Sequence, residues 1–579
     1  MKQQVLFFFF TLMLTGISVS AQTGGGRIAG VVIDNAGEEP LPGATIFIEE
    51  LKKGIVTDGH GEFLLSDVPA ATYTLTVRFI GYHTQTRKLT VGKERGKKII
   101  IRLKAEAKSL DEVVVMGKSE ARKLREQAMP ISVISMNQIQ GTVNNVQDIL
   151  AKTAGITVRA TGGTGSTSRI SVRGLEGKRI GLFIDGNPMN DNSDFIDIND
   201  IPVEMIDRIE IYKGVVPAKF GGSAVGGAVN IVIKEYPPKY LDVNYSYGSF
   251  NTHNASVVSK MNIAPKGIEF GLGGFYTYAD NDYKMKSPFQ EGLTITRDHD
   301  KFKKTVIGGS FKARKWWFDL VEFEPVFIHT YKDIQGIESN IRHAHSHSNA
   351  FIFANKMEKE NFLLDGLDLD WQLGYIYTDY HFADTASHRT HWDGTHYPAV
   401  SEFGGEIGKW ASLLTNEKHQ LQHKLNLNYL VNENHSVNFN SLLKYAHANP
   451  RDGMKDKVIG YRTDFPSNMF SWVAGLNYDY RTSNDKFLNS FNVKYYYYSM
   501  KTRMASVLVK TAEDIDTHKN DFGISNALRY RITPSLMAKA SFGYDVRLPS
   551  EEELLGDGYV IAPAGNLTPE RNISRSEER

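Results

Sequence analysis

Two polar stretches of the sequence are rich in histidine and could bind a ligand. They are RHAHSHS, with His343, His345 and His347, and HRTHWDGTH, with His388, His391 and His396. Alternating residues of a strand share one face, so neutral imidazoles spaced by two could hold a metal or haem. The alternative is a polar loop that happens to be histidine-rich. These six histidines are therefore candidate ligand-binding residues, and the metal is unknown.

The tryptophans offer a second way to hold a ligand. Trp316 and Trp317 are adjacent, Trp392 lies inside the second histidine stretch, and Trp410 follows it. Indole rings can stack on sugars, but a membrane interface accounts for tryptophan equally well. A glycan therefore stays open as the ligand, beside a metal chelate or haem.

The composition excludes several other kinds of chemistry. The chain of 579 residues contains no cysteine, so it has no disulfide, no Cys-ligated zinc and no Cys nucleophile. Its net charge of +1 gives no field that would attract nucleic acid. Residues 27–104 contain no metal-ligand pair or nucleophile constellation. We expect a protein that is not an enzyme and that needs no cofactor.

The N-terminus predicts export from the cytoplasm. One lysine precedes an apolar run, and Val19-Ser20-Ala21 fits a cleavage site, so residues 1–21 read as a signal peptide. The alternative is a retained anchor. Beyond this segment no run of 18 apolar residues occurs, so a membrane-embedded chain would have to be a β-barrel.

Three folded regions and a linker follow the signal peptide, and all are mainly β. Short apolar runs separated by Gly and Pro turns predict a small β-sandwich over 27–104. Residues 105–128 form a charged linker around the strand-like octet LDEVVVMG, and residues 129–235 mix helix and strand signals in a small α+β domain. From 236 to 579, ten-residue segments alternate apolar and polar residues, as in YLDVNYSYGS. Short turns alternate with long polar connections there, which is typical of a transmembrane antiparallel β-barrel.

The α+β region carries four motifs that name a family. ISVRGLEGKRIGLFIDGNPMND and IDRIEIYKGVVPAKFGGSAVGGAVNIVIK resemble the plug of TonB-dependent outer-membrane receptors. The matching residues are Arg173, Gly174, Asp185, Gly186, Arg208, Glu210, Gly214, Gly221, Gly226, Gly227, Asn230 and Lys234. Lys213 replaces the family arginine, and an ammonium group cannot form a bidentate contact.

The resemblance gives the octet a role. Leu110, Asp111, Glu112, Val113, Val114, Val115, Met116 and Gly117 resemble the TonB box that follows a carboxypeptidase-regulatory-like domain in Bacteroidetes-type receptors. Such a segment adds as a strand to the sheet edge of TonB, the periplasmic energy-coupling partner. The alternative is that 110–117 is the last strand of the sandwich or a buried linker strand.

The resemblance also implies how the plug is held. Buried charges need partners, so we expect Arg173 and Arg208 to meet carboxylates on the inner barrel wall, with Glu269 and Asp242 as candidates. The alternative is that both are ordinary surface arginines.

The end of the chain predicts an incomplete barrel. Residues 236–579 have room for about 12–14 strands, whereas plugged transporters of this family close at 22. VRLPSEEELLGDG and GNLTPE resemble family segments that lie well before the C-terminus. We therefore expect a C-terminally truncated chain.

The resemblance implies active import of a scarce ligand across the outer membrane of a Gram-negative cell. An iron chelate or haem is the first expectation, and a glycan or cobalamin is the alternative. A surface receptor that senses a ligand without transport, and a secreted enzyme or adhesin, are the competing classes. Expected partners are TonB, outer-membrane lipid and the small ligand, and a surface lipoprotein stays open as a further one.

Overall fold

A computed structural model describes the chain from residue 26 to residue 578. Fifteen internal segments lie outside the description: 36–38, 80–81, 93–97, 105–119, 136–145, 161, 190–197, 199–200, 264–266, 315, 337, 400–403, 507–509, 535 and 557–563. The chain divides into two compact units, Met1–Gly117 and Lys118–Arg579.

The first unit is the β-sandwich that the sequence predicts. Its strands are β1 (Gly26–Asp34), β2 (Thr45–Ile48), β3 (Lys53–Val56), β4 (Glu62–Val68), β5 (Thr72–Arg78), β6 (Gln85–Thr90) and β7 (Ile99–Leu103). One sheet has the order β4-β1-β7 and the other β3-β2-β5-β6. Side chains from both sheets, among them Val32, Ile46 and Leu75, form one buried core.

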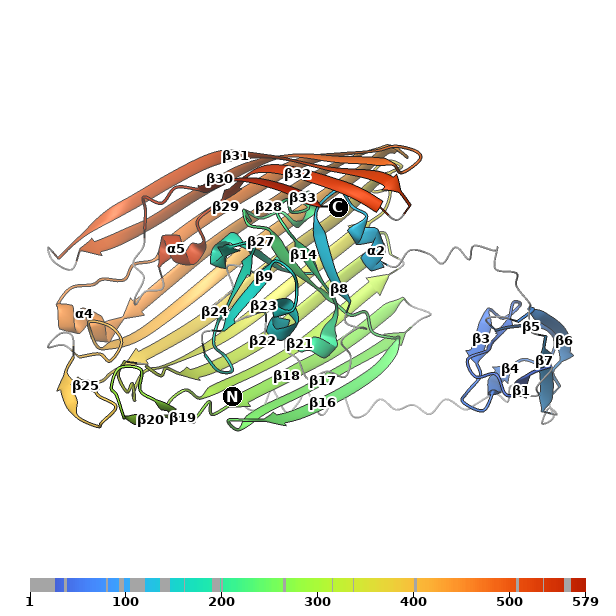
Figure 1. Ribbon diagram of the computed structural model, residues 1–579, viewed down its shortest axis with the longest axis horizontal. Helices are drawn as coiled ribbons and strands as arrows, with labels where there is room; N and C mark the ends of the chain where they lie inside the picture. The colour runs from blue at the N-terminus through green and yellow to red at the C-terminus, as the bar shows by residue number, and fades with distance from the viewer. Residues whose placement is uncertain are drawn as a thin grey trace. The chain divides into compact units, whose positions relative to one another are not determined.

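The second unit begins with a small α+β domain, which we call the plug (Figure 1). Its helices are α2 (Glu120–Arg125), α3 (Val146–Ala151), η2 (Gly177–Arg179), η5 (Val203–Met205) and η6 (Ala218–Phe220). Its strands are β8 (Ile131–Ser135), β9 (Ile156–Ala160), β10 (Ser168–Val172), β11 (Leu175–Glu176), β12 (Gly181–Ile184), β13 (Asn187–Pro188), β14 (Ile206–Tyr212) and β15 (Ala228–Ile233). They form a three-stranded sheet, β11-β10-β9, and a five-stranded sheet, β13-β12-β15-β14-β8.

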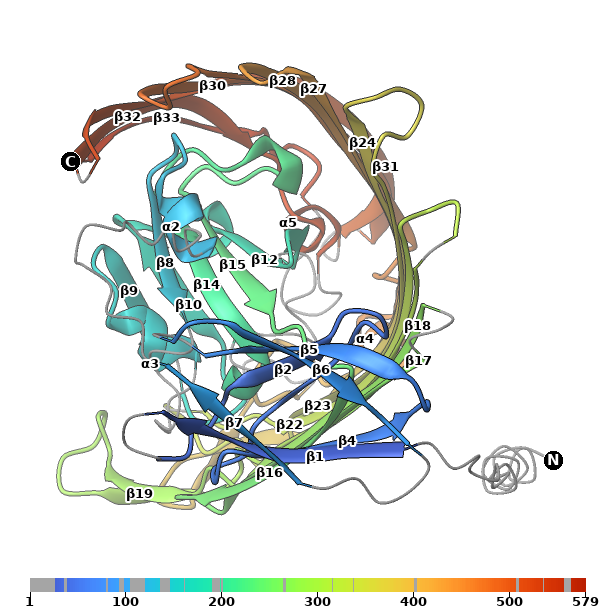
Figure 2. The ribbon, with the colours of Figure 1, turned by 90° about the vertical axis from the view of Figure 1, so that its right-hand side faces the viewer.

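A single 14-stranded antiparallel sheet, which we call the wall, curves around the plug (Figure 2). Its strands are β16 (Lys239–Gly248), β17 (Thr252–Ile263), β18 (Ile268–Ala279), β21 (Phe302–Arg314), β22 (Leu320–Asp333), β23 (His345–Lys359), β24 (Leu367–Asp384), β27 (Ser412–Asn432), β28 (His435–Asp452), β29 (Ser467–Arg481), β30 (Phe487–Ser506), β31 (Thr511–Thr533), β32 (Leu536–Arg547) and β33 (Glu570–Glu578). The predicted count of 12–14 strands is confirmed, and β16 and β33 are the edge strands.

The two ends of the wall differ in their connections. At one end, the turn end, the strands are joined by short segments such as 433–434 and 482–486. At the other, the loop end, lie the long connections 280–301, 334–344, 385–411, 453–466 and 548–569. These carry two hairpins, β19 (Tyr283–Lys286) with β20 (Thr294–Arg297) and β25 (His388–Thr390) with β26 (His396–Pro398), and two helices, α4 (Gly453–Ile459) and α5 (Glu551–Leu555). This is the asymmetry that the sequence predicts for a membrane barrel.

Alternation along the strands gives the wall an apolar outward face. Leu241, Val243, Tyr245 and Tyr247 of β16 are each more than 60% exposed, although all four are large and apolar. Residues of the opposite parity face the plug: Lys332 of β22 and Lys424 of β27 both donate hydrogen bonds to plug carbonyls. Such an exposed apolar face is stable in contact with lipid and unstable in contact with water.

No helix in the described part of the chain is both long and apolar enough to cross a membrane.

Candidate functional site

Two hairpin turns of the plug carry four of the motif residues. Arg173 and Gly174 have φ of 51° and 88°, and Asp185 and Gly186 have φ of 48° and 75°. Two successive positive φ values define a type I′ turn, for which Asp-Gly is a preferred pair. Gly186 then contacts the wall, because the Lys424 Nζ donates to its carbonyl at 2.7 Å. The second turn is thus a point where plug and wall are joined.

A buried polar network holds the plug sheet together around Glu210. Its carboxylate accepts hydrogen bonds from Arg208 Nε at 2.9 Å, Tyr212 Oη at 2.9 Å and Asn230 Nδ2 at 3.0 Å. Burial, reinforced by the Glu210 charge, raises the pKa of the Tyr212 phenol, so this group stays protonated and donates. Asn230 Oδ1 accepts from the Gly186 N–H at 2.9 Å, which ties the network to the hairpin turn.

The structure shows partners for both motif arginines. Arg208 pairs inside the plug, with Asp207 at 3.0 Å and Glu210 at 2.9 Å, so the prediction of a wall carboxylate is wrong for this residue. Arg173 donates to the Lys213 carbonyl at 3.2 Å and to the Ser576 hydroxyl of β33. Neighbouring carboxylates already satisfy Arg208, and sequence order alone did not reveal this.

The two wall carboxylates proposed for them have other partners. Glu269 is paired with Lys260 at 2.9 Å and Arg314 at 3.4 Å, both on the wall. Asp242 accepts a hydrogen bond from the hydroxyl of Tyr240, also on the wall, at 2.9 Å. Both carboxylates therefore stabilise the wall itself.

Three motif glycines lie where a side chain would meet neighbouring atoms, and Gly214 lies where the backbone conformation disfavours one. A Cβ at Gly227 would lie 2.2 Å from the Tyr212 carbonyl oxygen, and one at Gly226 would lie 2.7 Å from Ile180 Cδ1. At Gly221 it would lie 3.2 Å from Leu442 of the wall. Gly214 has φ of 119°, which side chains rarely allow. Lys234, the last motif residue, follows β15 and is anchored by its N–H to the Met205 carbonyl at 2.8 Å.

A charge network that the sequence analysis did not predict joins the plug to the last two strands. Lys178 pairs with Glu552 at 2.5 Å, and Arg179 pairs with Glu570. Arg547 then bridges Glu553 at 2.8 Å and Glu570 at 3.0 Å. The acidic residues lie in VRLPSEEELLGDG and GNLTPE, the two segments that the family resemblance had singled out. Their negative charges could have indicated a partner for the basic residues of the plug.

The beginning of the plug is fastened to the turn end of the wall by residues that we call the clasp: Glu126, Asp485, Arg529, Arg531 and Lys539. Arg531 pairs with Glu126 at 2.8 Å and with Asp485 at 3.0 Å, and Arg529 pairs with Asp485 at 2.6 Å. Arg529 also donates to the Glu126 carbonyl at 3.0 Å, and Lys539 donates to the Arg125 carbonyl at 2.6 Å.

Three of the clasp side chains are shielded from water, whereas that of Asp485 is 37% exposed. The Arg529 side chain is 2% exposed, and those of Glu126 and Arg531 are 9% and 13% exposed. Buried charges of this kind are stable only when paired, so removing one partner is costly. The predicted TonB box, 110–117, lies outside the described residues, and the described chain resumes with α2, just before the clasp.

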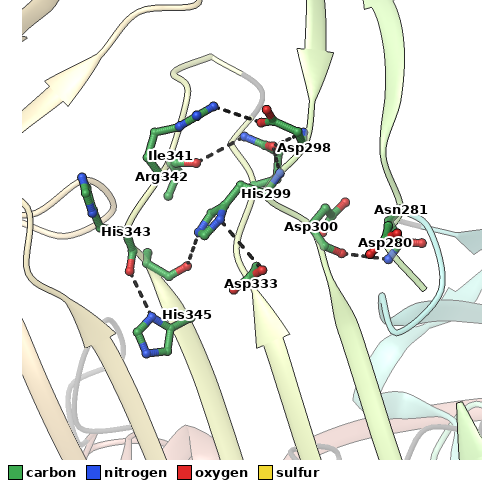
Figure 3. A network of polar contacts seen from close by, with 12 residues as sticks. Asp280, Asn281, Asp298, His299, Asp300, Asp333, Ile341, Arg342, His343 and His345 are labelled. Carbon is green, nitrogen blue, oxygen red and sulfur yellow. Dashed lines mark hydrogen bonds and ion pairs between the residues drawn. The ribbon is translucent and has the colours of Figure 1, made fainter. Parts of the chain in front are cut away.

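At the loop end a polar network connects the wall strands, the plug and two long connections (Figure 3). Asn281 binds the plug backbone at Thr164 through its Oδ1 at 3.1 Å and its Nδ2 at 2.9 Å. His299 Nε2 lies 3.1 Å from the Ala344 carbonyl, and Arg342 pairs with Asp298 at 3.0 Å. Burial raises the pKa of the Asp300 carboxyl, although Arg297 opposes this from 3.0 Å. Connections 280–301 and 334–344 are thus one polar surface.

Two buried carboxylates organise the longest connection. Asp384 accepts from the backbone N–H groups of Glu406 at 2.7 Å and Ile407 at 2.9 Å. Glu406 in turn accepts from the N–H groups of Arg342 at 3.1 Å and His343 at 2.8 Å. Connection 334–344, which carries His343, and connection 385–411, which carries the second histidine stretch, therefore lie side by side.

Replacing Asp384 by asparagine is expected to loosen connection 385–411. Each lost charge-assisted bond to a backbone N–H weakens the fold by about 1.5–3 kcal/mol. Proteolysis of intact cells should cut within 385–411 faster in this variant than in the parent. An Asp393→Asn variant, on an exposed carboxylate of the same connection, is the control and should behave like the parent; equal cleavage of all three chains would contradict the prediction.

The six candidate histidines do not form one cluster. His388 and His396 face each other across β25 and β26 with ring centroids 4.3 Å apart, and His391 stacks on Tyr397 at 4.0 Å. His343 precedes β23, while His345 and His347 lie on it, on the outward face. The ring of His347 stacks on that of His381 at 4.4 Å. Among the described residues no group of three or more His, Cys, Asp or Glu could hold a metal ion.

One cavity lies between plug and wall. A cavity of about 70 Å³ is lined by Phe183 and Ser223 of the plug, Leu442 and Val473 of the wall, and Lys178 and Arg547 of the charge network. This volume has room for a few water molecules and not for a ligand of chelate size.

Comparisons with known proteins agree with this architecture. Residues 28–115 match the CarboxypepD_reg-like domain, and residues 123–228 match the TonB-dependent Receptor Plug Domain. The chain is 28% identical over 249 residues to the TonB-dependent receptor P39 of Formosa agariphila, covering 42% of this chain and 23% of that protein. It is 24% identical over 265 residues to the vitamin B12 transporter BtuB of Vibrio vulnificus, covering 44% of this chain and 43% of the transporter. The matches thus span less than half the length of these relatives.

Solved structures share the fold. The hemophore receptor HasR of Serratia marcescens superposes with a TM-score of 0.55 at 16% identity, covering 78% of this chain and 69% of the receptor. The siderophore receptor PirA of Acinetobacter baumannii gives 0.56 at 13% identity, covering 79% and 69%. A wall of strands with a plug inside it defines the class of plugged outer-membrane receptors. With the plug and regulatory-like domains in their family order, the chain belongs to the TonB-dependent receptors and is an outer-membrane protein.

Proposed function

We propose that this receptor imports a scarce ligand across the outer membrane when TonB pulls on residues 110–117. The observation that carries the proposal is the clasp. It joins the first residues of the plug to the turn end, and it lies a few residues after the proposed TonB box. A pull on the box would load these bonds early, because they follow the box closely in the chain.

The proposed sequence of events follows from the contacts. The ligand binds at the loop end, where the plug backbone at Thr164 and the connections form one polar surface. TonB pairs with the box as an added strand, and a strand pulled along its axis transmits force through its backbone. Release of the clasp frees the N-terminal part of the plug, and the seam widens to admit the ligand.

An iron chelate or haem is the proposed ligand. HasR is described as a receptor in complex with its hemophore and heme, and PirA as a siderophore receptor. The histidines of connections 334–344 and 385–411 offer imidazoles at the mouth, which suits iron-containing ligands. Cobalamin, for which the BtuB relative is named, and a glycan are the alternatives.

Deleting residues 110–117 at the chromosomal locus in the native host should abolish uptake while leaving ligand binding intact. Without residues 110–117, TonB has no segment of the receptor with which its sheet edge can pair. Growth would be measured on limiting iron chelate, haem, cobalamin or glycan as the only source of the nutrient, with binding of the labelled ligand to whole cells as the second readout. A scrambled octet of the same composition should fail like the deletion.

Two results would redirect the proposal. If the deletion strain grows like the parent on every source, the chain is not a TonB-driven importer of these ligands. If the deletion removes a transcriptional response to the ligand but not its uptake, the sensing receptor replaces the importer.

A further inference from the structure

Asparagine side chains form a strip on four neighbouring strands of the wall, which we call the amide strip. Its members are Asn426 of β27, Asn438 and Asn440 of β28, Asn477 of β29 and Asn492 of β30. Register places Asn426 opposite Asn440. In the next row it places Asn438 opposite Asn477, and Asn477 opposite Asn492. Residues far apart in the sequence therefore form one continuous polar surface.

The amide strip faces the plug. Asn426 lies two residues after Lys424, whose Nζ donates to the plug carbonyl of Gly186 at 2.7 Å, so both side chains lie on the inward face. Residues that are directly paired in a sheet, or that are two positions apart in one strand, share a face. The other four asparagines of the strip are connected to Asn426 by such steps, and they face inward as well.

The strip is buried, yet most of its amide groups have no partner. Asn440 is 1% exposed, and within the described chain neither its Nδ2 nor its Oδ1 has a hydrogen-bond partner. The Oδ1 atoms of Asn426, Asn438 and Asn492 are buried and unpartnered in the same way. Asn477 Oδ1, by contrast, accepts from a serine hydroxyl of β30 at 3.1 Å. Because unpartnered buried amides destabilise a fold, a group of them indicates a surface whose partner is water or a ligand.

The strip lies between two places where plug and wall touch. Toward the loop end it begins beside Leu442, which lines the cavity between plug and wall and lies against Gly221 of the plug. Toward the turn end it approaches the clasp, because Leu488, farther along β30 than Asn492, packs in a buried cluster with Ala128 of the plug. The strip therefore runs along the inner wall from the cavity to the clasp.

The nearest charged groups lie on the loop side of the strip and have partners. Lys424 is bound to the plug, and Lys494 of β30, which is 6% exposed, is attracted by the carboxylate of Asp545 on β32. The strip itself is uncharged, and each amide can both donate and accept hydrogen bonds. A surface that a solute crosses must bind it weakly at several positions so that the solute can leave. Uncharged amides meet this requirement for hydroxyl, carbonyl and amide groups.

We propose that the amide strip is the path by which the ligand passes the plug, from the cavity to the clasp. The strip binds water at rest and exchanges it for hydroxyl, carbonyl or amide groups of the ligand when the clasp opens. The path lies on β27–β30 and not on β22–β23, which are farther round the wall (Figure 2). This inference rests on the proposed import function.

Single thiols can test the path, because the chain contains no cysteine. Asn440→Cys places a thiol on the strip, and Ser348→Cys on β23 is the matched control, since the two parent residues are 1% and 3% exposed and both face inward. Whole cells of the native host, with and without residues 110–117, are treated with N-ethylmaleimide, and the purified receptor is analysed by mass spectrometry. Asn440→Cys should react about tenfold faster when 110–117 are present, since reaction follows the population of the open state. Ser348→Cys should react at one slow rate in both strains.

Asn492→Cys is a second strip position and should behave like Asn440→Cys. Equal acceleration at Ser348→Cys would mean that the path is not confined to the strip. No acceleration at either strip position, in cells whose growth requires 110–117, would mean that the plug opens elsewhere. Either result overturns the proposed path and leaves import standing. If growth does not require 110–117, import and the path are both overturned.

Discussion

A Gly227→Ala receptor is expected to have an unfolded plug inside an intact wall. Gly227 has φ of 112°, and its Cβ would lie 2.2 Å from the Tyr212 carbonyl oxygen. The backbone strain and the overlap together are expected to cost about 3–5 kcal/mol, the upper range for a single substitution. The plug sheet cannot relax easily there, because Tyr212 is tied to the buried Glu210 network. Trypsin should then cut purified receptor within 129–235 at a concentration that leaves the parent intact.

The Gly214→Ala variant separates the effect of backbone strain from that of steric overlap at the Cβ. Gly214 has φ of 119°, and within the described part of the chain no heavy atom beyond Gly214 and its two chain neighbours lies within 4 Å of its Cβ position. Only the conformational cost, about 1–2 kcal/mol, should remain. Its plug should therefore resist trypsin far better than that of Gly227→Ala. Equal sensitivity of the two variants would show that the contact with Tyr212 does not decide the fold.

Arg531→Met is expected to open the clasp. The substitution removes one partner of the Glu126 carboxylate, whose side chain is 9% exposed, while the ion pair of Glu126 with Arg122 at 3.1 Å is kept. Breaking a buried pair from one side costs about 3–5 kcal/mol, and the Arg122 contact reduces this to about 2 kcal/mol. Amide hydrogen exchange in 122–135 should then be roughly 30-fold faster, since local opening sets that rate.

Arg503→Met is the matched control for the clasp. Arg503 also makes an ion pair at 2.7 Å, with Asp514, but the two side chains are 48% and 77% exposed. A pair so accessible to water contributes little, so exchange in 122–135 should not change. Unchanged exchange in Arg531→Met as well would mean that the clasp does not hold the plug, and the proposed route of force would lose its basis.

The alternation of apolar and polar residues in strands and the positions of tight turns could be predicted from the sequence, because both depend on local chemistry. YLDVNYSYGS predicted a strand with one apolar face, and Leu241, Val243, Tyr245 and Tyr247 are indeed exposed together on β16. Asp185-Gly186 predicted a tight turn, and both residues have positive φ. Such features depend on each residue and its neighbours, so no tertiary information was required.

Ion pairs between residues far apart in the sequence could not be predicted. Lys178 meets Glu552 across 374 positions, and Glu126 meets Arg531 across 405. Arg208 was expected to meet a carboxylate of the wall and instead pairs with Asp207 and Glu210 of the plug. Any arginine of the plug could satisfy any carboxylate of the wall by charge alone, and only the register of the strands decides which ones meet.

The histidines show the same division. By itself the sequence determined the family, the β-sandwich, the plug, the strand-built wall and the presence of histidine at alternating positions of 343–347. Only the tertiary structure decided that His345 and His347 face outward, that His347 lies opposite His381, and that His419 lies opposite His447. The physical reason is that alternation gives two faces per strand, and which face turns toward the plug is determined when the sheet curves and its neighbours pair.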